Sequence, residues 1–227
     1  MKKIIIPVLA LFISSCASNE IGHSKDVNQD EIHQGYSINY DESRNETEVI
    51  AFFRFAGPNG TTLILDEPSK IELNGETMNN IQSGLGSYYS KSVKGKLPDN
   101  EYVFAFSDIT GKKFENKIDF RNMQIEELPK EIKKSDGLTI HFPNKPEGRK
   151  EDLTVEISDD STTVSEVWKN VVFERVKFPK EKLDQLHGKV KVNIHRNGLL
   201  ELRQHTHAGG FFSSEYTLAP REITLIE

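Results

Sequence analysis

From residue 36 to the end, the chain alternates between short strand-forming runs and turn-forming residues, and this rhythm is what most constrains its fold. The runs are rich in Val, Ile, Phe, Tyr and Thr, and Gly, Asn, Asp or Pro interrupts them about every ten residues. Such spacing is typical of a β-sandwich or barrel, in which each strand turns one face to the core. The sequence therefore predicts an all-β protein.

The strands are expected in two groups, each large enough for one sandwich. Residues 126–136 are charged and contain Pro129, which favours a linker between a first domain at 35–125 and a second at 137–227. A short helix is expected between Pro179 and Gly188. The strands expected in the first domain are Tyr36–Tyr40, Glu48–Phe55, Thr61–Leu65, Lys70–Leu73, Ser87–Val93, Glu101–Ser107 and Lys112–Phe120, and those in the second are Leu138–Phe142, Leu153–Ile157, Val164–Phe173, Lys189–His195, Leu199–Thr206, Phe211–Leu218 and Glu222–Ile226.

A hairpin is expected around Asn197-Gly198, between two of these strands. A three-residue loop with Gly198 as the bulge would pair Ile194 with Leu200 on one face and leave the charged residues on the other. A two-residue turn would set apolar against charged side chains. The longer loop is therefore the predicted one.

Several aromatic residues alternate with polar ones and are predicted to lie in the core. A carbohydrate-stacking platform would instead require them to be exposed and coplanar. The residues predicted to face the core are Ala51, Phe53, Phe55, Tyr102, Phe104 and Phe106.

The first fifteen residues have the pattern of an export signal. Two lysines precede a run of about ten apolar residues, which is too short to span a bilayer, and small residues follow it. Residues 1–15 are therefore predicted to be a signal peptide. The sequence Ile13-Ser14-Ser15-Cys16 resembles the lipobox of bacterial lipoproteins, which implies cleavage before Cys16, acylation of Cys16 and anchoring in the lipid bilayer.

The residues after Cys16 bear on location. In enterobacterial lipoproteins an Asp at the next position favours inner-membrane retention, and Ala17 stands here. The resemblance thus implies the outer membrane, facing the periplasm. Some groups mark surface lipoproteins with an acidic cluster after the cysteine, and the single Glu20 leaves surface exposure open. Residues 16–34 are polar and are expected to form a lipidated, flexible tether.

Charge and cysteine content exclude several functions. Loss of residues 1–15 removes two lysines and no acidic residue, so the net charge changes from −6 to −8. An acidic chain is repelled by nucleic acid, which is therefore not an expected partner. Cys16 is the only cysteine, so the exported part has no thiol for a disulfide, a zinc-thiolate site or a nucleophile.

His205 and His207 are weak candidates for a metal site. Two residues apart on an expected strand, they would point to the same face about 7 Å apart. Two ligands do not make a structural zinc site, and solvated strand histidines are the simpler interpretation. No metal and no cofactor is expected.

Carboxylates are numerous but lie in predicted turns and charged runs. Glycoside hydrolysis needs two of them roughly 5 to 10 Å apart across a cleft. No pattern in the sequence brings a pair together, and no catalytic residue is predicted. The carboxylates considered are Asp66, Glu67, Asp108, Glu126, Glu127, Glu151, Asp152, Asp159 and Asp160.

Asp160-Ser161-Thr162 resembles the short O-glycosylation sequon of some Gram-negative groups. The resemblance implies a glycan at Ser161 or Thr162, in a polar, turn-like stretch. A pattern this short also arises by chance.

Residues 13–16 and the strand rhythm together resemble bacterial lipoproteins that carry tandem immunoglobulin-like β-sandwiches. The resemblance implies two such domains, although Trp168 has no disulfide to pack against. Sandwiches of this kind host many functions. We expect a non-enzymatic envelope module that binds a protein or glycan; the alternatives are an envelope hydrolase acting on glycan or peptide and a metal-binding protein that uses the two histidines.

Overall fold

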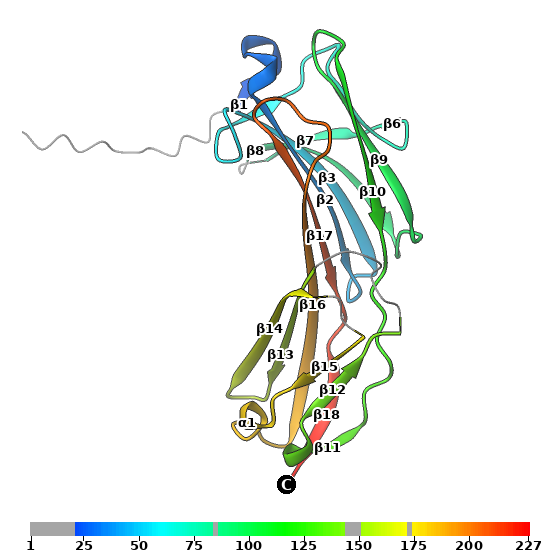
Figure 1. Ribbon diagram of the computed structural model, residues 1–227, viewed down its shortest axis with the longest axis vertical. Coiled ribbons are helices and arrows are strands. Elements are labelled where there is room, and N and C mark those ends of the chain that lie inside the picture. The colour runs from blue at the N-terminus through cyan, green and yellow to red at the C-terminus, as the bar shows by residue number, and fades with distance from the viewer. Residues whose placement is uncertain (1–20, 84–85, 144–150, 172–173) are drawn as a thin grey trace, which may run out of the picture.

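The computed structural model describes residues 21–83, 86–143, 151–171 and 174–227. The predicted signal peptide and Cys16 lie outside these residues. Strands make up nearly all the regular structure, which confirms the predicted all-β class. Figure 1 shows an elongated molecule with its C-terminus at one end. Among the described residues, no helix has the length and apolar character needed to cross a membrane.

Most predicted strands are present, and the structure adds several short ones. The helical elements are α1 (Lys180–Leu183) and three 3-10 turns at Ser24–Asp26, Gln29–Glu31 and Lys134–Asp136. The strands are β1 (Ile21–His23), β2 (Ile32–Asp41), β3 (Glu46–Phe55), β4 (Thr61–Ile64), β5 (Lys70–Leu73), β6 (Glu76–Thr77), β7 (Asn79–Ser83), β8 (Gly86–Lys94), β9 (Asn100–Ser107), β10 (Lys113–Phe120), β11 (Glu131–Lys133), β12 (Leu138–His141), β13 (Glu151–Ser158), β14 (Thr163–Val171), β15 (Arg175–Phe178), β16 (Lys189–Glu201), β17 (Gly210–Thr217) and β18 (Arg221–Ile226).

The upper half in Figure 1 is a sandwich of two sheets. The four-stranded sheet β10-β9-β5-β6 packs against the large sheet that contains β3, β2 and β17. Rings from the two sheets meet between them: Phe53 of β3 lies 4.6 Å from Phe106 of β9, and Tyr36 of β2 stacks on Phe104 at 4.7 Å, centroid to centroid. The core assignment of Phe53, Phe104 and Phe106 is confirmed, since all three side chains are fully buried.

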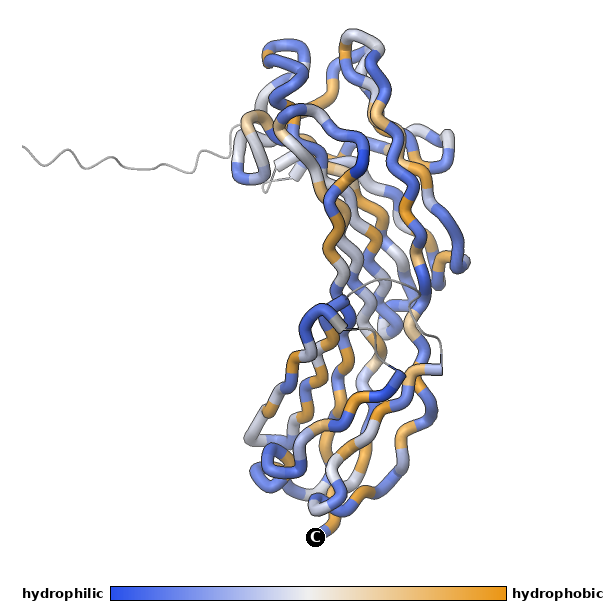
Figure 2. The backbone as a smooth tube through the Cα atoms, viewed as in Figure 1, coloured by the Kyte–Doolittle hydropathy of each residue, from blue (hydrophilic) through white to orange (hydrophobic). Residues whose placement is uncertain are grey.

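The lower half pairs the other end of the large sheet with the two-stranded sheet β12-β15. Alternate residues of β13 are buried, as the regular change of colour along these strands in Figure 2 illustrates. Leu153, Val155 and Ile157 face a core that also contains Ile140 of β12 and Phe178 of β15. The period-two pattern is what a strand needs when one face is buried.

The large sheet continues through both halves, because β16 belongs to both. Its first residues pair with β18 and β13, and its last seven pair with β17. β17 in turn pairs in parallel with β2 over eight residues. Strands from residues 137–227, predicted as the second domain, therefore complete the sheet formed by residues 35–125, predicted as the first. The order in the large sheet is β1-β4-β3-β2-β17-β16-β13-β14, with β7-β8 attached to β3 and β11-β18 to β16.

The predicted hairpin at Asn197-Gly198 is wrong, because both residues lie inside the continuous strand β16. Gly198 serves close packing there, not a turn. A Cβ at this position would lie 2.7 Å from Ser214 Oγ and 3.2 Å from Glu151 Oε1. A larger residue here would require these two side chains to move.

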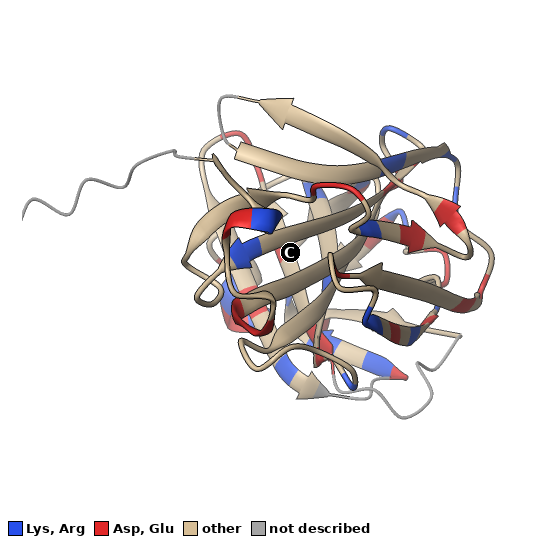
Figure 3. Ribbon diagram, turned by 90° about the horizontal axis from the view of Figure 1, so that it is seen from above, with Lys and Arg blue, Asp and Glu red and all other residues tan. Residues whose placement is uncertain are grey.

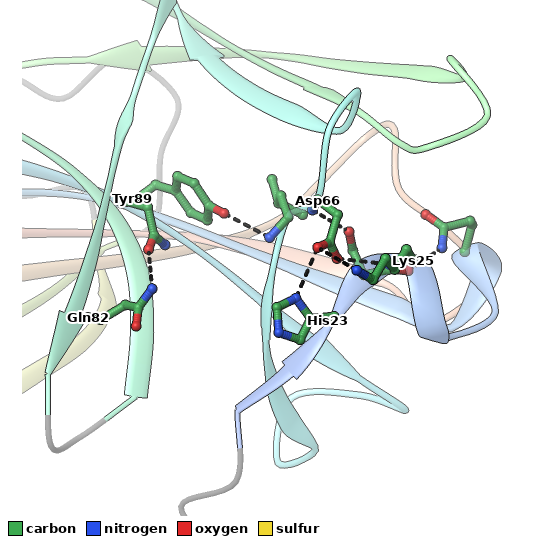
Figure 4. Close-up of polar contacts among 9 residues, drawn as sticks. His23, Lys25, Asp66, Gln82 and Tyr89 are labelled. Carbon is green, nitrogen blue, oxygen red and sulfur yellow. Dashed lines mark hydrogen bonds and ion pairs between the residues drawn. The ribbon is translucent and has the colours of Figure 1, made fainter.

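Residues 21–34, expected to be part of a flexible tether, pack on the end of the upper sandwich. β1 pairs in parallel with β4, and the buried Ser24 Oγ accepts a hydrogen bond from the Asp66 backbone N at 2.8 Å. The Asp66 carboxylate lies 2.9 Å from His23 Nδ1 and 3.7 Å from Lys25 Nζ, as Figure 4 shows. These contacts join residues that are more than forty positions apart and do not depend on an apolar pattern, so the polar composition of the segment did not predict them.

Candidate functional site

A shallow groove lies on the exposed face of the large sheet, over β3, β4 and β8. Residues of β3 alternate between the core and this face, so every second side chain reaches the groove. Its volume is about 310 Å³, at the lower end of the range for ligand sites. The lining residues are Glu48, Ile50, Phe52, Arg54, Thr62, Gly86, Ser87 and Tyr88.

Phe52 forms the apolar centre of the groove. Its ring lies across Gly35 of β2, where an added Cβ would be 2.1 Å from the ring, and it meets Phe211 of β17 edge-on at 5.7 Å. The Arg54 guanidinium lies 5.2 Å from the ring centroid. Gly35 thus allows an aromatic plane to lie flat on the sheet, and its neighbours hold it in place.

Tyr88 is the second aromatic residue of the groove, and its neighbour Tyr89 has a different role. Tyr89 points inward, and its hydroxyl accepts a hydrogen bond from the Leu65 backbone N at 2.8 Å (Figure 4). Burial raises the pKa of Tyr89. Tyr88 is half-buried, lines the groove and lies opposite Ile81 of β7 in the ladder. Adjacent residues of a strand face opposite ways, so only one of the two tyrosines belongs to the core.

Glu48 and Arg54 give the two ends of the groove opposite charge. They are six residues apart on β3, which is about 20 Å along an extended strand. Ser90 Oγ donates to Glu48 Oε1 at 3.4 Å. Glu48 is the one carboxylate among the lining residues, whereas acid/base hydrolysis needs two.

A larger cavity, of about 800 Å³, lies at the far end of the lower half. The turn between β13 and β14 lines part of this cavity and carries both residues of the proposed glycosylation pattern. Ser161 is exposed and Thr162 is half-buried. The described lining residues include no Phe, Tyr or Trp. The lining residues are Ser158, Asp159, Asp160, Ser161, His187, Gly188, Lys189, Val190, Lys191 and Glu222.

Asp159 organises this turn. Its Oδ1 accepts from the backbone N of Ser161 at 2.8 Å and of Thr162 at 2.7 Å, and its Oδ2 accepts from the His187 backbone N at 3.0 Å. These hydrogen bonds to backbone N–H groups lower the pKa of Asp159 to about 2. A carboxylate held in its ionised form in this way is a poor general acid, so the cavity does not favour hydrolysis by Asp159.

Asp159 is expected to make the stability of the fold depend on acid pH. Its pKa is about 2 in the folded chain and 3.8 ordinarily, so its ionised form stabilises the fold above about pH 4, and this contribution is lost as the pH falls toward 2. Urea midpoints of the wild type and Asp159→Asn should therefore differ at pH 6 and converge by pH 2. Midpoints separated by the same amount at both pH values would contradict this role.

Comparisons with known proteins give no family. No known family matches the chain, and no curated protein matches it. Solved structures to which the chain shows a weak similarity include one described as a bacterial ice-binding adhesin, in work on its retention at the host cell surface (13% identity, TM-score 0.25, 86% of this chain and 64% of that one). Another is the protein SGBP-B from the mixed-linkage glucan utilization locus of Bacteroides ovatus, in complex with a heptasaccharide (11% identity, TM-score 0.23, 91% and 66%). In both cases this chain spans slightly less than two thirds of the other protein.

The two histidines considered as metal ligands do not lie on a strand. His205 and His207 belong to the loop between β16 and β17, so the strand geometry predicted for them is wrong. His205 Nδ1 lies 2.7 Å from the carbonyl oxygen of Thr206. Within the described ranges, no three His, Cys, Asp or Glu side chains come together as a metal site would require.

Two of the remaining carboxylates, those of Asp108 and Glu151, have polar partners within the fold. Asp108 is buried and accepts from the backbone N of Thr110 at 2.8 Å, and Glu151 forms an ion pair with Arg196. Glu126 and Glu127 line a third cavity of about 440 Å³ together with Arg221 and Glu222. Neither Asp66 nor Glu67 nor Asp152 lines any of these three cavities.

The sequence contained a signal for the groove that its strand rhythm alone does not reveal. Phe52 falls on the polar face of its strand, between the charged positions Glu48 and Arg54. Tyr88 and Tyr89 are adjacent, so one of them must point away from the core of any sandwich strand. A large aromatic residue at an outward position is common when it stands alone, and two of them on one sheet face indicate an exposed apolar surface.

Proposed function

We propose that this protein is a non-enzymatic glycan-binding module of the bacterial cell envelope, and that the groove over β3 is its binding site. One observation supports this most: two aromatic side chains, Phe52 and Tyr88, lie on an exposed sheet face that also carries charged and hydroxyl groups. Sugars present an apolar ring face and a rim of hydroxyls. Aromatic planes complement the first, and Glu48, Arg54 and Thr62 can hydrogen-bond the second.

The lining of the groove favours binding over hydrolysis. Its single carboxylate, Glu48, lacks the second that both retaining and inverting mechanisms use. The groove is open and about 20 Å long, which suits a chain that lies along β3 rather than one that enters a pocket. A short segment of polysaccharide is therefore the proposed ligand.

The anchor is the second part of the proposal and rests on the lipobox resemblance at Ile13–Cys16. Acyl chains on Cys16 would hold the protein at the outer membrane with its sandwiches toward the periplasm. We expect the wild type in the membrane fraction and Cys16→Ala in the soluble fraction of cell lysates. Equal partitioning of both would contradict lipid anchoring, and digestion of the wild type by protease on intact cells would place the sandwiches outside.

The glycan function is tested with the purified protein on immobilised bacterial and plant polysaccharides. Tyr88→Ala should weaken binding about fivefold or more, since a stacked aromatic ring contributes about 1 kcal/mol or more. Leu199→Ala is the matched control, because Leu199 is 69% exposed on β16, away from the groove lining. Binding unchanged by Tyr88→Ala, or turnover of a bound polysaccharide, would contradict the proposal.

A further inference from the structure

Strand β7 ends one side of the large sheet and carries none of the features that usually protect a sheet edge. Among the residues that the structure describes, β8 is the one strand that β7 pairs with, and all five residues of β7 are exposed. Its sequence, Asn79-Asn80-Ile81-Gln82-Ser83, contains no charged residue and no proline, so the strand is tan throughout in Figure 3. An unprotected edge offers unpaired backbone N–H and C=O groups to another strand.

Two other strands that end a sheet, β10 and β14, are protected by charge. β10 carries Lys113 and Lys117. β14 is also covered in part, since Lys182 of α1 donates to the Ser165 carbonyl oxygen and forms an ion pair with Glu166 at 2.6 Å. In contrast to these two strands, β7 carries no charged residue along its edge.

We propose that β7 pairs in antiparallel fashion with β7 of a second copy of this protein. The five residues are self-complementary about Ile81: the pairing sets Ile81 against Ile81, Asn80 against Gln82 and Asn79 against Ser83. No like charges meet across this seam, although the protein as a whole has a net charge of −6. A neutral segment is where two copies of an acidic protein can meet without repulsion.

The pairing would join the exposed faces of two molecules into one. Ile81 lies directly opposite Tyr88, and opposite residues of a ladder point to the same face. A two-fold axis normal to the sheet keeps that face on the same side in both copies. The two grooves would then lie on one continuous surface, with Ile81 and Tyr88 of each copy between them. The association itself does not depend on the glycan function.

A single five-residue seam buries less than the roughly 1,200 Å² of a stable interface. The dimer is therefore weak, with a dissociation constant on the order of 100 µM in solution. Tethering at a membrane would raise the effective concentration of the two copies.

Sedimentation velocity from 10 µM to about 1 mM, without glycan, tests the proposal. A Cys16→Ser background removes the only thiol and the acyl chains as causes of association. The parent protein should shift toward a dimer with concentration. Ile81→Lys and Ile81→Glu should each stay monomeric, and an equimolar mixture of the two should form the dimer again, because opposite charges then meet at the two-fold axis.

Val167→Lys is the matched control, since Val167 is also an exposed apolar residue on an edge strand, β14. It should dimerise like the parent. A parent protein that stays monomeric up to 1 mM, a dimer that persists in Ile81→Lys, a mixture that does not associate, or a loss of the dimer in Val167→Lys would each overturn the proposal. Loss of glycan binding with the dimer retained would refute the proposed function alone.

Discussion

A fragment ending at residue 125 is expected not to fold, although it contains ten of the strands. Without β17, the whole edge of β2 is open, and eight residue pairs of the sheet are lost. The fragment also lacks Phe212 and Tyr216, which are fully buried and contact the aromatic residues of the upper core. Far-UV circular dichroism should show no cooperative unfolding transition on heating.

Complementation provides the control for this fragment. Residues 126–227 supply β16 and β17, so co-expression of the two fragments should restore a soluble complex with a cooperative transition. A fragment ending at residue 125 that unfolds cooperatively by itself would contradict the shared sheet. It would show instead that the upper strands form an independent domain.

The substitution Arg196→Met is expected to destabilise the protein by about 3–5 kcal/mol, which is the typical cost of leaving one buried charge without its partner. Arg196 and Glu151 are 4% and 5% exposed, and Arg196 Nε lies 3.2 Å from Glu151 Oε2. The guanidinium also lies 5.3 Å from the centre of the Tyr216 ring and donates to the Arg121 carbonyl oxygen. This ion pair lies where β16 passes from the lower half to the upper half.

Two variants isolate the effect of the buried pair in urea denaturation. Replacing both residues, as Arg196→Met with Glu151→Leu, should recover most of the lost free energy of unfolding, since a buried ion pair exchanged for apolar residues is often neutral. Arg203→Ala, an exposed arginine in the next loop, should change the free energy of unfolding by less than about 0.5 kcal/mol. A double variant as unstable as Arg196→Met would show that lost packing, rather than the unpaired charge of Glu151, accounts for the decrease in the free energy of unfolding.

The sequence predicted strands well where local pattern determines them. The alternation in β3 and β9 correctly assigned Phe53, Phe104 and Phe106 to the core, because burial of one face imposes a period of two. The short strands β1, β6 and β11 escaped prediction. They contain two or three residues each, which is too few to show a pattern. β1 and β11 form by pairing with distant strands, and β6 pairs with β5 across the turn at Asn74-Gly75.

Long-range pairing explains the largest difference from expectation. Asn197-Gly198 has the composition of a turn, yet it lies in the middle of a thirteen-residue strand, since Ser214 and Glu151 approach the backbone of Gly198. A glycine required by packing and a glycine required by a turn look alike in one sequence. The parallel pairing of β2 with β17, about 175 residues apart, has no local signal either.

In the candidate site, too, some features follow from the local sequence and others depend on residues far along the chain. The outward direction of Phe52 follows from the alternation along β3. Its position over Gly35 and against Phe211 does not, because these residues come from two other strands, one of them near the end of the chain. The groove is therefore a product of the strand order in the sheet.

The most direct test of the proposed binding site is chemical-shift mapping by NMR with an oligosaccharide taken from a polysaccharide that the protein binds. The account predicts that the largest shifts on titration fall on backbone amides of β3 and β8, around Phe52 and Tyr88. Shifts that fall instead around Asp159, His187 and Lys189 would place the ligand in the cavity of the lower half and contradict the proposed site.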